Sequence, residues 1–98
     1  MIIEVKKNQA VVEESTEVVI ALQEVSDSRK GLFTVTLPGK DPQQFPNRTV
    51  GDIWRFGRNG KKYRLSLLEL SYITNIAKLE LRLDPDGSDP LPEQKGTQ

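Results

Sequence analysis

The residues of this chain that are best suited to bind a charged partner are basic, and they gather in one segment. Residues 48–64 contain one acidic residue, Asp52, together with six basic and three aromatic residues. The basic residues are Arg48, Arg55, Arg58, Lys61, Lys62 and Arg64, and the aromatic ones are Trp54, Phe56 and Tyr63. Such a cluster attracts phosphates or the carboxylates of an acidic protein, and exposed rings beside it would stack on nucleic-acid bases. The alternative is that the rings fill the core and the cations cover an ordinary solvated face.

The other residue types do not indicate catalysis. The chain has no cysteine and no histidine, which excludes disulfides, a thiolate metal site, a cysteine nucleophile and the commonest general base. No pair of carboxylates and no glycine-rich phosphate loop stands out as a catalytic motif. Asp84, Asp86 and Asp89 superficially resemble a calcium loop, but Gly87 is at the fourth position and no glutamate follows at the twelfth. We therefore expect a protein that is not an enzyme and that needs no metal or cofactor.

Charge is segregated along the chain although its total is zero. The 98 residues include 14 basic and 14 acidic ones. Residues 1–27 carry a net charge of −4, residues 28–64 carry +7 and residues 65–98 carry −3. The positive middle predicts a protein partner with an acidic surface, with nucleic acid as the alternative. Glu13, Glu14 and Glu17 either surround a turn or pair with the basic segment of a second copy of the chain.

The basic segment is predicted to form a β-hairpin. Residues 50–56 and 61–72 alternate between polar and apolar types and flank Asn59-Gly60, whose residues tolerate the positive φ angles of a tight turn. Arg55 and Arg64 are then expected on the face opposite the aromatic residues.

The hairpin is predicted to continue into a three-stranded meander. After Leu67 the apolar positions move by one residue, which predicts a β-bulge near Leu67-Leu68. A turn at Thr74-Asn75 leads to a third strand over residues 76–83.

Four further strands are expected earlier in the chain, over residues 2–6, 10–13, 17–25 and 32–37, with the second pairing back on the first. Together these elements predict an all-β fold, a small antiparallel sandwich or barrel of six to seven strands. The alternative is an α+β fold with a helix near residues 16–25, because Val18, Leu22 and Val25 would share one helical stripe.

Residues 38–49, with three prolines, are expected to form a long central loop that either binds a partner or crosses between sheets. The domain is expected to span residues 1–83 and to be followed by a flexible tail, residues 84–98, whose only aliphatic residue is Leu91. No signal peptide or membrane-spanning run is evident, which predicts a cytoplasmic protein without membrane contact.

The sequence thus favours a non-catalytic protein-binding module, such as an accessory, inhibitor, immunity or assembly component, that uses the basic hairpin and the long central loop. One alternative is a nucleic-acid-binding domain of OB-like architecture that uses residues 48–64. Another is a self-assembling structural protein.

Overall fold

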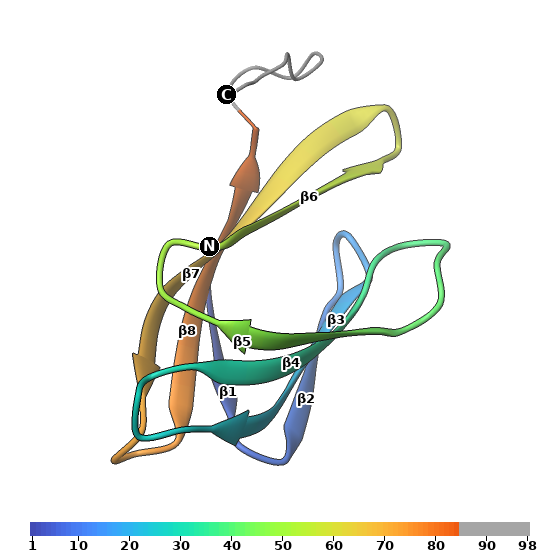
Figure 1. Ribbon diagram of the computed structural model, residues 1–98. Coiled ribbons are helices and arrows are strands. Elements are labelled where there is room, and N and C mark those ends of the chain that lie inside the picture. Colours follow the sequence, from blue (N-terminus) through green and yellow to red (C-terminus); the bar gives the residue numbers. More distant parts are fainter. Residues whose placement is uncertain (85–98) are drawn as a thin grey trace.

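The computed structural model describes residues 1–84, which form two antiparallel four-stranded sheets and no helix (Figure 1). The strands are β1 (Ile2–Lys6), β2 (Gln9–Glu13), β3 (Val18–Val25), β4 (Gly31–Thr36), β5 (Gln43–Arg48), β6 (Ile53–Arg58), β7 (Lys61–Ser71) and β8 (Ile76–Leu83). One sheet, called sheet A, has the order β1-β8-β7-β6, and sheet B has the order β2-β3-β4-β5. The all-β class is confirmed, with eight strands rather than six to seven. The predicted tail lies outside the described residues except for Asp84.

The segment that was compatible with either a strand or a helix is strand β3. Its register against β4 shifts between Leu22 and Glu24, so the strand contains a bulge. The bulge returns Val25 to the buried side, which Val18 and Leu22 already occupy. The helix-like spacing of these three residues therefore comes from a strand with one extra residue.

The predicted long central loop is wrong, because Gln43–Arg48 forms strand β5 at an edge of sheet B. Pro46 lacks a backbone N–H, and an edge strand tolerates this because one of its sides has no ladder to complete. Phe45 lies opposite Phe33 of β4 and packs against the core. The proline content masked the strand.

The predicted pairing of the second strand on the first is also wrong. Strand β1 pairs with β8 in sheet A, whereas β2 pairs with β3 in sheet B. The chain passes between the sheets at Lys7 and Asn8, whose backbone N–H groups donate to Asn75 of the β7–β8 turn and to Leu22 of β3. These polar residues mark a crossing between layers rather than a hairpin.

The meander of β6, β7 and β8 is confirmed, although its first strand covers Ile53–Arg58 rather than residues 50–56. Arg58 pairs with Lys61 across a two-residue turn in which Asn59 and Gly60 have φ angles of 54° and 77°, as a type I′ turn requires. The β7–β8 register shifts between Leu67 and Glu69, so the predicted bulge is present.

The core lies between the inner faces of the two sheets. Its largest fully buried side chains include Phe33, Ile20, Leu22, Leu65, Leu67 and Leu79. Trp54 of β6 is 7% exposed, and its ring meets those of Phe33 and Phe45 edge to face, with centroids 5.7 Å apart in each pair. Among the residues that the structure describes, no helix is long and apolar enough to cross a membrane.

Candidate interaction surface

Three arginines form one row across neighbouring strands of sheet A. Arg55 of β6 lies opposite Arg64 of β7, and Arg64 lies opposite Arg82 of β8. The adjacent row, Trp54, Leu65 and Leu81, is buried. Because successive side chains in a strand point to opposite faces, the three arginines lie on the outer face of sheet A. We call Arg55, Arg64 and Arg82 the arginine row.

The two outer arginines of the row have acidic partners within the chain, and the middle one has none among the described residues. Arg55 Nε donates to Asp84 Oδ2 at 3.2 Å, and Arg82 Nη1 lies 3.7 Å from Glu80 Oε1. Arg64 is half-buried, and its Nε is fully buried without a hydrogen-bond acceptor. The row therefore contains one uncompensated guanidinium at its centre.

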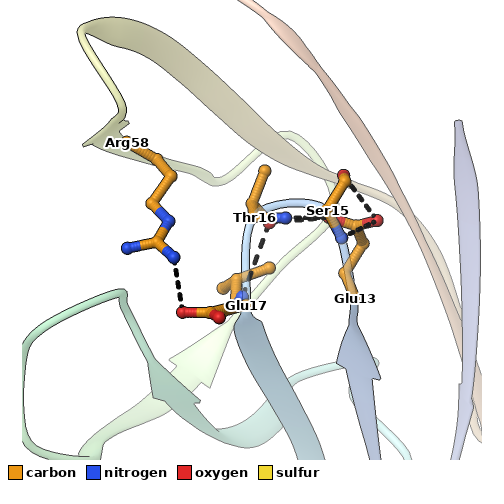
Figure 2. A network of polar contacts seen from close by, with 6 residues as sticks. Glu13, Ser15, Thr16, Glu17 and Arg58 are labelled. Carbon is orange, nitrogen blue, oxygen red and sulfur yellow. Dashed lines mark hydrogen bonds and ion pairs between the residues drawn. The ribbon is translucent and has the colours of Figure 1, made fainter.

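Arg58 and Lys61 lie at the tip of the hairpin, on the strand side opposite to the arginine row. Arg58 Nη2 donates to Glu17 Oε1 at 2.7 Å, which connects the hairpin to the turn between β2 and β3 (Figure 2). The hairpin projects past that turn (Figure 1). Glu17 thus pairs with the basic segment of its own molecule. The self-association alternative had placed this kind of contact between two copies of the chain.

The β2–β3 turn is organised by the carboxylate of Glu13 (Figure 2). Ser15 Oγ donates to both carboxylate oxygens at 2.8 Å, and Thr16 donates through Oγ1 at 2.7 Å and through its backbone N–H at 2.9 Å. Burial of the carboxyl group raises its pKa. The hydrogen bonds from Thr16 and Ser15 together lower the pKa by a larger amount, so the pKa of Glu13 falls from 4.5 to about 2. Glu13 stays ionised and fixes the turn that holds Glu17 against Arg58.

The six basic residues of the predicted site do not form one surface. Arg55, Lys62 and Arg64 follow the outer face of sheet A, whereas Arg58 and Lys61 occupy the opposite side of the hairpin tip. Arg48 ends β5 in sheet B, where its Nε donates to the carbonyl oxygen of Pro46 at 3.1 Å and lies 3.7 Å from Asp52.

The aromatic residues of the basic segment are occupied by contacts within the protein. Trp54 is buried in the core. Phe56 and Tyr63 stack on each other with centroids 5.6 Å apart and an interplanar angle of 19°, and both are half-buried against the core. None of the three offers an open ring on the face that carries the arginine row.

Sequence reasoning missed two features of the surface. Arg82 was not among the predicted site residues, and only the register of β8 on β7 brings it beside Arg64. The second feature is a hollow of about 450 Å³ beside the β7–β8 turn. Its exposed apolar lining residues are Val50, Leu68, Tyr72 and Ile73. The sequence signal that could have indicated this hollow is the predicted bulge, because the bulge leaves Leu68 40% exposed.

No cluster of three or more His, Cys, Asp or Glu side chains that could hold a metal ion occurs within residues 1–84. Asp86, Gly87 and Asp89 of the rejected calcium-loop pattern lie outside that range. Comparison with protein-family models, with curated proteins and with solved structures found no match.

Proposed function

We propose that the protein is a non-catalytic protein-binding module that recognises an acidic partner through the basic outer face of the β6–β8 meander together with the lysines at the tip of its hairpin, Lys61 and Lys62. The observation that supports this is the arginine row, three adjacent cations in register on a sheet face that no described element covers. Positive patches of this kind steer and select acidic partners. An accessory, inhibitor, immunity or assembly component would work in this way, without catalysis or a cofactor.

Nucleic-acid binding has less support than protein binding. Base stacking needs open aromatic rings next to the cations, and here Trp54, Phe56 and Tyr63 pack against other residues of the chain. The two four-stranded sheets also differ from the five-stranded barrel of an OB fold. Self-assembly through opposite charges has less support because Arg58 already pairs with Glu17 in the same molecule.

The chain offers a matched pair of variants for testing the proposal. Lys61 and Lys62 are adjacent exposed lysines at the hairpin tip, and Lys6 and Lys7 are adjacent exposed lysines on the opposite edge of sheet A and at the crossing to sheet B. Replacing both members of a pair with glutamate changes the charge equally in the two variants.

The double variant K61E/K62E is expected to bind the partner about tenfold more weakly, with most of the change in the association rate and in its salt dependence. The partner is first isolated from source cells with tagged wild-type protein, and its affinity for wild type and both variants is then measured by calorimetry and stopped-flow kinetics. K6E/K7E is expected to bind like wild type. Equal affinity of K61E/K62E and wild type would contradict the proposed surface, and tight binding of oligonucleotides instead would favour the nucleic-acid alternative.

A further inference from the structure

We propose that Arg64 is the anchor of this surface and that it binds a carboxylate group of the protein partner. The inference rests on the proposed function and names the group that the surface recognises. The chain itself provides one acidic side chain for Arg55 and one for Arg82, at 3.2 and 3.7 Å. Arg64 lies between them and has no acidic partner among residues 1–84.

Arg64 lowers the stability of the free protein. Like charges directly opposite each other in neighbouring strands destabilise a sheet, and Arg64 faces an arginine on both sides. Its Nε has also been removed from water without gaining an acceptor, which adds a desolvation cost. On a solvated sheet face that binds no ligand, threonine at this position would give a more stable protein, because threonine fits a strand and carries no charge. The cost is recovered when an anion binds.

The anion that fits best is a carboxylate. Only the Nε of Arg64 is fully buried, so the terminal Nη atoms reach the surface, and a guanidinium presents its donors as a planar fork that matches the two oxygens of a carboxylate. The three arginines of the row and the two acids that flank it leave a single excess positive charge. One Asp or Glu side chain of an acidic protein partner supplies the opposite charge that Arg64 lacks within residues 1–84.

The test uses a blocked peptide of five glutamates as the probe and a peptide of five glutamines as its control. Binding is followed by NMR through the Nε–Hε signals of the arginines in 15N-labelled protein. The variants are R64Q and K78Q, since Lys78 lies on the same outer face and its removal changes the net charge equally. We expect the Arg64 signal to shift with a saturating curve in wild type, and the affinity to fall about tenfold in R64Q while K78Q stays close to wild type.

Three other results would overturn the inference in different ways. Equal glutamate-peptide affinity in wild type, K78Q and R64Q would show an acid-binding face that is not anchored at Arg64, and the proposed function would stand. If the Arg64 signal responds to inorganic phosphate or an oligonucleotide but not to the peptide, the carboxylate assignment is wrong. Absence of any shift of the Arg64 signal with the peptide at millimolar concentration would also show that Arg64 is not the anchor. This conclusion would hold whatever the result of the K61E/K62E measurement.

A stability measurement tests the cost of Arg64 without a ligand. We expect R64T to raise the Tm of the free protein by about 3 °C, because it removes two like-charge contacts and one unsatisfied donor. K78T, which breaks a 3.8 Å contact with Glu69, is expected to leave the Tm unchanged or to lower it slightly. A lower Tm in R64T would mean that Arg64 stabilises the sheet. It would contradict the claim that Arg64 destabilises the free protein.

Discussion

Replacing Glu13 with glutamine is expected to lower the free energy of unfolding by about 2 kcal/mol near neutral pH, because an amide cannot accept the full set of hydrogen bonds that the carboxylate receives. The affected donors belong to Ser15 and Thr16, and Thr16 is completely buried, so its hydroxyl and backbone N–H cannot turn to water instead. Urea denaturation of wild type and E13Q measures the loss. The matched control is E14Q, since Glu14 is an exposed residue of the same turn.

The effect of Glu13 is expected to depend on pH. Its pKa is lowered from 4.5 to about 2 in the folded protein, so its contribution is fully present above the unfolded value and is lost as the pH falls toward the folded one. The difference in stability between wild type and E13Q should therefore be constant above about pH 5 and should shrink between about pH 4.5 and pH 2. A difference that stays constant across that interval would show that Glu13 does not titrate with a lowered pKa.

Replacing Phe33 with alanine is expected to cost about 3–5 kcal/mol, which is a large part of the 5–15 kcal/mol that stabilises a typical domain. The ring is completely buried and meets Trp54 edge to face. It also covers the backbone of its strand neighbour Gly31, where an added Cβ would lie 2.8 Å from the Cε1 atom of the ring. The substitution leaves a cavity in the centre of the sandwich and removes the ring that shields Gly31 from water.

The protein contains one tryptophan, so the fluorescence of Trp54 reports on this part of the core directly. Wild type is expected to give a blue-shifted emission that acrylamide quenches poorly. F33A should unfold at a much lower urea concentration, and its folded form should be quenched more readily. F33L is expected to lose less, and I73A, at a position that is 88% exposed, should not change the midpoint. A red-shifted, quenchable emission in wild type would place Trp54 on the surface and contradict the structure.

The meander was predictable because its signals are local. Asn59-Gly60 specifies a two-residue turn, strict alternation assigns each side chain of β6 and β8 to a face, and the change of phase after Leu67 announces a bulge. The faces of Arg55 and Arg64 followed from this pattern. The neighbour of Arg64 on its other side did not, because alternation gives the face of Arg82 but not its register.

The wrong predictions concern features of the fold that are determined by tertiary contacts rather than by local sequence. Strand β5 forms in a segment of loop-like composition because Phe45 gains a place in the core and the edge position has no need of the N–H that Pro46 lacks. The partner of β1 lies more than seventy residues away in β8, as the register of Ile3 with Leu79 shows, and no local pattern identifies a contact of that range. The ion pair of Arg58 with Glu17 also joins residues that are far apart in the sequence, 41 positions.

The proline of strand β5 has a consequence for how copies of the protein behave at high concentration. An open edge strand offers unpaired backbone groups on which another chain can build a continuous sheet, the first step toward fibres and precipitates. At Pro46 the edge strand β5 of sheet B lacks a donor, and at Arg55 and Arg58 the edge strand β6 of sheet A carries two positive charges. These two edges, β5 and β6, thus resist edge-to-edge pairing with another copy, while the sheet face between the edges remains open to a partner.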